Sequence, residues 1–112
     1  MTDGLEAEDA KLVTLARGAR GRVGAASGAA VRDETGRTYS GADVILPSLS
    51  ISSLALAVAQ AVAAGARGAE AAVVVGPDPT PADVDAYRDL AGPGAALLVC
   101  SSDGAVRSRL TT

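Results

Sequence analysis

Two short apolar runs separated by a capped helix place the strongest constraint on how this chain can fold. The runs at residues 71–75 and 95–101 each have the length of a strand rather than a helix. Between them, Thr80 is a good N-cap and Pro81 suits the first position of a helix that runs to about residue 91. A strand–helix–strand crossover makes the two strands parallel neighbours, and such apolar strands are covered on both faces. We therefore predict an α/β fold, a three-layer α-β-α sandwich.

Most of the remaining segments complete the predicted order αββαβαββ around a five-stranded mixed sheet. A helix is expected at residues 5–22, where acidic side chains occupy the first turn and arginines the last. A turn at residues 33–36 joins the first two strands into a hairpin. We expect one domain over residues 1–112, with a core from about 5 to 110. The remaining strands are expected at residues 26–32, 37–44 and 105–110.

The segment 44–66 contains no charged residue, although 21% of the chain is charged. We expect a helix to open at Pro47-Ser48 and to end at about residue 64, before Gly65. Because this helix is apolar nearly all round, it should be buried in the core or at a subunit interface. The segment has about the length that spans a bilayer, but its serines and its glutamine favour burial within a protein. Residues 1–4 lack the pattern of a secretory signal, so we expect a cytoplasmic protein without membrane association.

The residue types that are missing exclude several classes of chemistry. The chain has no histidine, so imidazole can serve neither as general base nor as metal ligand. Cys100 is the only cysteine, which excludes a Cys/His zinc cluster and a disulfide within one chain. We expect its thiol to be buried and inert. The only aromatic residues, Tyr39 and Tyr87, are expected to pack with their hydroxyls at the surface. A net charge of −3 gives no electrostatic case for binding nucleic acid.

Three local strings are more specific than composition. Residues 27–44 are SGAAVRDETGRTYSGADV, residues 54–59 are LALAVA, and residues 81–85 are PADVD. They resemble the first hairpin, the C-A-E-R-x-A string and the P-C-G-x-C string of the cytidine deaminase family of zinc-dependent nucleoside deaminases, in the same order and at similar spacing. The resemblance covers about residues 11–108 and implies a cytidine deaminase-like fold.

The resemblance also implies where a deaminase site would lie. In the family, three Cys, or a His and two Cys, hold a zinc ion that activates water, and a Glu carries protons. Here Leu54 stands at the first ligand position and Leu56 at the position of the Glu. Ala82 and Asp85 stand at the other two ligand positions, and Asp43 begins the string that corresponds to the ribose-binding one. These five are interpreted as vestigial pocket positions, with Leu54 and Leu56 filling the former pocket with apolar side chains.

These departures favour a catalytically inactive protein on a cytidine deaminase-like fold, either a homo-oligomer (dimer or tetramer) or a subunit that binds another protein. No catalytic, metal-binding or cofactor-binding residue is predicted, and no cofactor. The alternative is an enzyme of the family that hydrolyses cytidine or deoxycytidine to uridine or deoxyuridine and ammonia. If the resemblance fails, Leu54 and Leu56 are ordinary helix core. RNA binding through Arg17, Arg20 and Arg22 is a third possibility, but no aromatic residue is interleaved there to stack bases.

Overall fold

The computed structural model describes residues 5–112, and their helices and strands follow the predicted order with one added hairpin. Strands β2, β1, β5, β6 and β7 form one sheet in that spatial order; β5 and β6 are parallel and the other neighbours antiparallel. The predicted α/β fold with a five-stranded mixed sheet is confirmed. The elements are α1 (Ala7–Val23), β1 (Gly28–Asp33), β2 (Thr38–Ala42), β3 (Val44–Leu46), β4 (Leu49–Ile51), α2 (Ser53–Ala63), β5 (Ala69–Val75), α3 (Pro81–Ala91), β6 (Ala96–Cys100) and β7 (Val106–Thr111).

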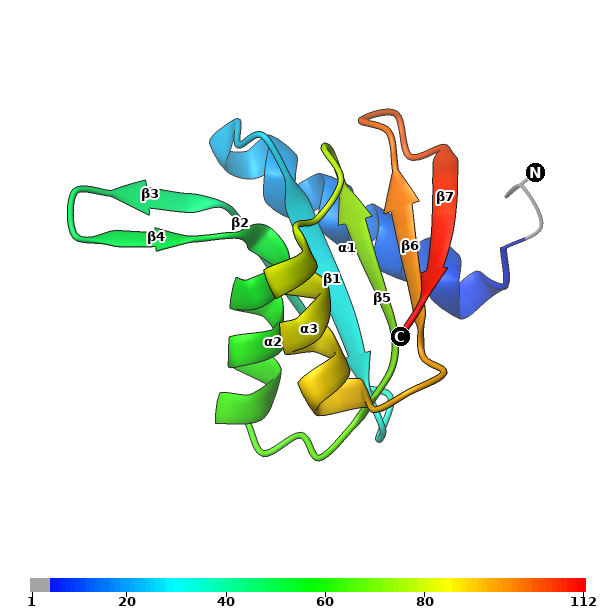
Figure 1. Ribbon diagram of the computed structural model, residues 1–112. Coiled ribbons are helices and arrows are strands. Elements are labelled where there is room, and N and C mark those ends of the chain that lie inside the picture. The colour runs from blue at the N-terminus through cyan, green and yellow to red at the C-terminus, as the bar shows by residue number, and fades with distance from the viewer. Residues whose placement is uncertain (1–4) are drawn as a thin grey trace.

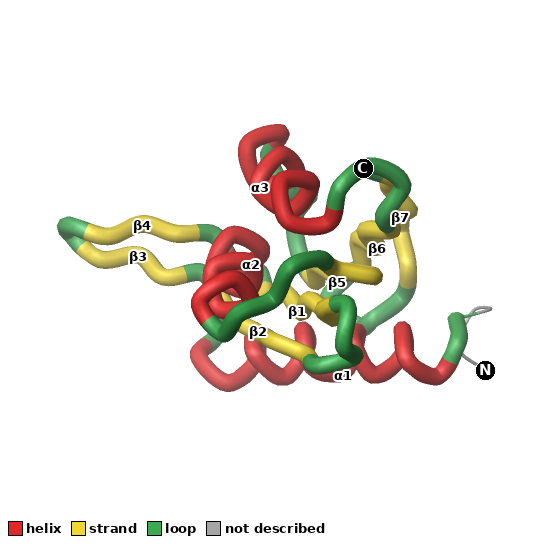
Figure 2. Tube along the Cα trace, turned by 90° about the horizontal axis from the view of Figure 1, so that it is seen from below, coloured by secondary structure: helices red, strands yellow, loops and turns green. Residues whose placement is uncertain are grey.

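Helices cover both faces of the sheet, with α1 on one side and α2 and α3 on the other (Figure 1, Figure 2). The arrangement follows from the alternation of side chains along a buried strand. Val74 of β5 packs with Leu54 and Tyr87 in the core beneath α2 and α3. Its neighbour Val73 packs with Leu12 in the core beneath α1. Two cores therefore share one central strand, which gives the three layers expected from the sequence.

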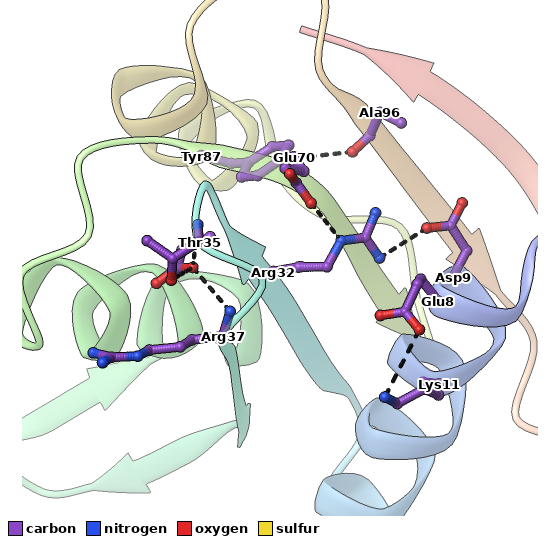
Figure 3. Close-up of polar contacts among 10 residues, drawn as sticks. Glu8, Asp9, Lys11, Arg32, Thr35, Arg37, Glu70, Tyr87 and Ala96 are labelled. Carbon is purple, nitrogen blue, oxygen red and sulfur yellow. Dashed lines mark hydrogen bonds and ion pairs between the residues drawn. The ribbon is translucent and has the colours of Figure 1, made fainter.

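Close contacts hold α1 against the sheet. The guanidinium of Arg32 in β1 lies between Asp9 of α1, at 3.1 Å, and Glu70 of β5, at 2.8 Å (Figure 3). The Arg32 side chain is only 13% exposed, so these ion pairs are better shielded from water than ordinary surface pairs. At Gly28, a Cβ atom would overlap the carbonyl oxygen of Ala16, which shows how closely the α1 backbone approaches β1.

The prediction that the tyrosine hydroxyls lie at the surface is wrong for Tyr87. This side chain is completely buried, and its hydroxyl donates to the carbonyl oxygen of Ala96 at 2.9 Å (Figure 3). The inward face of α3 packs this ring into the core, where the hydroxyl requires a partner within the protein. Burial raises the pKa of Tyr87. Cys100 is buried as predicted, and burial likewise raises the pKa of its thiol.

The prediction that a helix opens at residues 47–48 is also wrong. Residues 44–51 form the β3–β4 hairpin, which leaves the body of the molecule as a separate arm (Figure 1, Figure 2). α2 begins only at Ser53, because the Ser52 hydroxyl accepts the N–H of Ala55 and thereby caps the helix. Within the part of the chain that the structure describes, no helix is both long enough and apolar enough to cross a bilayer.

The turn between β1 and β2 is built around the buried carboxylate of Asp33. This carboxylate accepts hydrogen bonds at 2.7 to 3.0 Å from the N–H and hydroxyl of Thr35, the N–H of Arg37 and the hydroxyl of Tyr39. Burial acts to raise the pKa of Asp33, but the hydrogen bonds outweigh it and lower the pKa from 3.8 to about 2. The charged form of Asp33 is therefore part of the folded structure.

This lowered pKa predicts a loss of stability in acid. Because folding favours ionised Asp33, its contribution to the free energy of unfolding is complete above about pH 4 and is lost as the pH falls toward about 2. Asp33→Asn should be less stable than the parent at neutral pH and should approach it near the bottom of this range, as measured by urea unfolding. The control Asp89→Asn changes an exposed carboxylate on α3 and should follow the parent throughout. A stability deficit of Asp33→Asn that does not change with pH would contradict this assignment.

Candidate functional site

A pocket of about 190 Å³ lies where α2 and α3 begin, beside the carboxyl end of β5. Ligands commonly bind at this end of parallel strands in α/β sheets. The first N–H groups of each helix have no partner within the helix, so two helix starts bring unpaired donors to the same place. The loop at residues 77–79 forms part of the wall. The remaining polar wall consists of Ser27, Asp43, Ser52, Ser53 and Asp83.

Asp43 connects the start of α2 to the residue that precedes β1. One carboxylate oxygen accepts the N–H of Ser27 at 3.0 Å. The other accepts the Ser27 hydroxyl at 2.9 Å and the N–H of Ser53 at 2.8 Å. The Ser27 and Ser53 hydroxyls are also hydrogen-bonded to each other, at 2.7 Å. Asp43 thus satisfies one of the unpaired donors of α2 and places a negative charge at the positive end of its dipole.

Asp83 connects the start of α3 to the start of α2. Within α3 it completes a capping box, since the Thr80 hydroxyl accepts the N–H of Asp83 at 3.2 Å and an Asp83 oxygen accepts the N–H of Thr80 at 3.4 Å. The other Asp83 oxygen accepts the hydroxyl proton of Ser52 at 2.8 Å. Because Ser52 is the N-cap of α2, one chain of hydrogen bonds runs from one helix start to the other.

The structure places two of the five expected positions, Asp43 and Leu54, in the wall of this pocket. Leu54 is 1% exposed and also belongs to the core beneath α2 and α3. Leu56 is half-buried on another side of α2, where its side chain lies against β2. Ala82 and Asp85 are exposed residues of the first turns of α3. Leu56, Ala82 and Asp85 are not among the residues that line the pocket.

The side chains that the sequence resemblance places at the family's zinc-ligand positions do not suit zinc. Leu54 and Ala82 have no donor atom, and the single carboxylate of Asp85 does not make a tetrahedral site. Among residues 5–112, no three Cys, Asp or Glu side chains are grouped so that they could hold a metal ion. The pocket carboxylates Asp43 and Asp83 instead accept hydrogen bonds from backbone N–H groups and serine hydroxyls.

Sequence patterns alone did not identify Ser27, Ser52, Ser53 and Asp83 as members of one site. Two signals were present: a pair of serines before an otherwise apolar helix, and an Asp three residues after the Thr80 N-cap. Each signal indicates a helix start, but neither indicates that the two starts meet. That contact depends on how α2 packs against α3 on the sheet.

The hydrogen bond between Ser52 and Asp83 predicts energetic coupling between the two helix starts. Ser52→Ala and Asp83→Ala should each lower the free energy of unfolding by about 1–2 kcal/mol, since each removes a helix cap. The double variant should lose about 1 kcal/mol less than the sum of the two, because the shared bond is lost only once. The matched control pairs Asp83→Ala with Ser50→Ala, an exposed hairpin serine, and should be additive. Additive losses in both cycles would contradict the coupling.

Comparisons with protein families and with solved structures identify relatives of this chain. A family model described as cytidine deaminase-like matches residues 5–104. No curated protein matches this chain. Nineteen chains of solved structures match. They include the cytidine deaminase of Burkholderia pseudomallei, with a TM-score of 0.80, 25% identity and 90% of each chain covered.

The cytidine deaminase of Mycobacterium leprae matches with a TM-score of 0.76 and 16% identity, over 95% of this chain and 94% of that one, and this likeness concerns the fold. The family match extends over α1 through β6, which includes both helix starts and the pocket between them. From the family model and the shared fold together, it follows that this chain belongs to the cytidine deaminase-like family.

Proposed function

We propose that this chain is a non-catalytic member of the cytidine deaminase-like family that works as a homo-oligomeric structural or partner-binding protein. The observation that carries the proposal is the set of side chains at the positions to which the sequence resemblance assigns the family's chemistry. Leu54, Leu56 and Ala82 offer neither a metal ligand nor a proton carrier. Leu54 in addition packs into the core, so the pocket wall at that point is apolar.

Hydrolytic deamination needs an activated water and a group that moves protons at the same point. Zinc supplies the activated water in the zinc deaminases. The carboxylates of this pocket are engaged within the protein: Asp43 binds the start of α2, Asp83 binds the starts of both helices, and Asp78 pairs with Arg107 at 3.0 Å. This engagement supports a structural role for the pocket carboxylates.

The Ser52–Asp83 hydrogen bond also supports the proposal, because it connects the two helix starts without a metal ion. In the zinc deaminases that the sequence resembles, the first ligand position falls on α2 and the other two on α3, so the metal joins the two helices. In this chain, Ser52 and Asp83 join the same two helix starts directly at 2.8 Å. We therefore assign to this bond the structural part of the metal's role.

Self-association is supported by the surface. Several large aliphatic side chains are exposed on the hairpin and on α2, within the uncharged segment 44–66. The core is built largely of Ala, Val and Leu, and such side chains bury little area per residue. A second subunit would add apolar burial where a single chain of this size has little.

Zinc content and turnover test the loss of catalysis. The parent, produced with zinc in the medium, should carry far less than one zinc per chain by elemental analysis. It should cause no ultraviolet change with cytidine or deoxycytidine. The cytidine deaminase of Burkholderia pseudomallei, assayed in parallel, is the positive control for turnover. Stoichiometric zinc in the parent, with turnover abolished by a chelator, would establish the enzyme alternative instead.

Light scattering coupled to size exclusion tests self-association. At micromolar concentrations the parent should have at least twice the mass of one chain, because the uncharged apolar surface is expected to be covered by another subunit. A mass of one chain over the whole concentration range would exclude the homo-oligomer.

A further inference from the structure

The β3–β4 hairpin exposes three large aliphatic side chains to solvent although it has only three residue pairs to stabilise it. Ile45 is 81% exposed, Leu46 57% and Leu49 51%. The hairpin pairs three residues with three and extends away from the five-stranded sheet (Figure 1, Figure 2). An isolated two-stranded hairpin is only marginally stable in water, and an exposed aliphatic patch on such an arm marks an interaction surface.

The pairing of the hairpin places four of its five Val, Leu and Ile side chains on one face, whereas Ile45, opposite Ser50, lies on the other. Val44 lies opposite Ile51, and Leu46 lies opposite Leu49. Because side chains alternate along a strand, these two pairs share a face, half-buried at the base and exposed at the tip. The arm thus presents a row of aliphatic pairs that ends in the exposed Leu46–Leu49 pair.

A second apolar surface is the outer face of α2, the helix that follows the arm in the chain; Arg67 and Asp89 border this face where Val62 lines a surface hollow. No residue of α2 is charged, yet the outer face of α2 is exposed at Ala59, Gln60, Val62 and Ala63, with Val62 54% exposed. The uncharged stretch continues from the arm into the helix without interruption, and the nearest charged residues along the chain are Asp43 and Arg67. All 23 charged residues of the chain lie outside it.

These two surfaces indicate a second copy of this chain as the occupant. A protein partner with an ordinary charged surface would leave its charges unpaired against the arm, which has no charged residue. An anionic membrane is disfavoured too, because the segment carries no Lys or Arg and the net charge is −3. A protruding apolar arm beside an uncharged helix face, in contrast, is complementary to itself under a two-fold rotation.

The dimensions agree with that occupant. Each strand of the arm has three residues, a reach of about 10 Å at 3.3 Å per residue. α2 has 11 residues, a length of about 16 Å at 1.5 Å per residue. We propose that two copies of this chain associate about a two-fold axis, with the β3–β4 arm of each laid along the exposed face of α2 of the other. This inference rests on the proposed homo-oligomer and names the surface that forms it.

Charged substitutions at the arm tip test whether the arm forms the subunit contact, and the parent protein tests whether an oligomer exists at all. Leu46→Glu/Leu49→Glu should raise the dissociation constant at least 100-fold by light scattering and sedimentation, with an unchanged circular dichroism spectrum. The matched control Val23→Glu adds a charge at an equally exposed aliphatic residue, at the end of α1, and should associate like the parent. A monomeric parent would overturn the proposed homo-oligomer itself. A parent oligomer that survives both arm substitutions would overturn only the assignment to the arm.

Cross-linking identifies what the arm contacts. A photo-reactive amino acid in place of Ser48, at the tip of the arm, should form cross-links to residues 59–63 of a second chain. Mixing isotopically labelled and unlabelled chains shows by mass spectrometry that the link joins two copies. Cross-links to α1 or β7 of the second chain would overturn the proposed surface. Co-sedimentation of the parent with phosphatidylcholine vesicles, lost in the arm variant, would overturn it in favour of a lipid surface.

Discussion

Burial of β5 on both faces is the constraint on which the rest of the structure depends. Consecutive residues of this strand face opposite cores, so helices must cover the sheet on both sides. Its parallel pairing with β6 requires a crossover, and α3 provides it. The crossover starts at the carboxyl end of β5, where α2 also begins, and this brings the two helix starts together around one pocket. The position of the pocket is therefore a consequence of the sheet.

Two adjacent helix starts present the same electrostatic requirement whatever residues occupy them. Each offers unpaired N–H groups and the positive end of a dipole, and each favours a negative group. In the zinc deaminases that the sequence resembles, cysteine ligands stand at these positions. Here Asp43 and Asp83 meet the requirement by accepting hydrogen bonds from both helix starts. The capping carboxylates thus satisfy donors that the fold brings together at the two helix starts.

The uncharged segment 44–66 contains structures of two different kinds. Its first part forms an arm with exposed aliphatic residues, and its second part forms α2, whose inner face is core and whose outer face is exposed. Neither part has the charged surface that usually keeps a small protein monomeric in solution. In the proposed function, these exposed apolar surfaces are covered by another subunit.

The sequence by itself was sufficient for the order of the five sheet strands and three helices and for the family resemblance. These depend on period, caps and short strings, which are local. It led to a wrong start for α2, since an uncharged apolar run is compatible with either a helix or a hairpin until pairing is known. Of the five pocket positions that it indicated, Asp43 and Leu54 line the pocket, and Leu56, Ala82 and Asp85 do not. It did not indicate the pocket residues Ser27, Ser52, Ser53 and Asp83. Only the tertiary structure decided that Ser52 meets Asp83, because hydrogen bonds between residues 31 positions apart form only once both helices pack on the same face of the sheet.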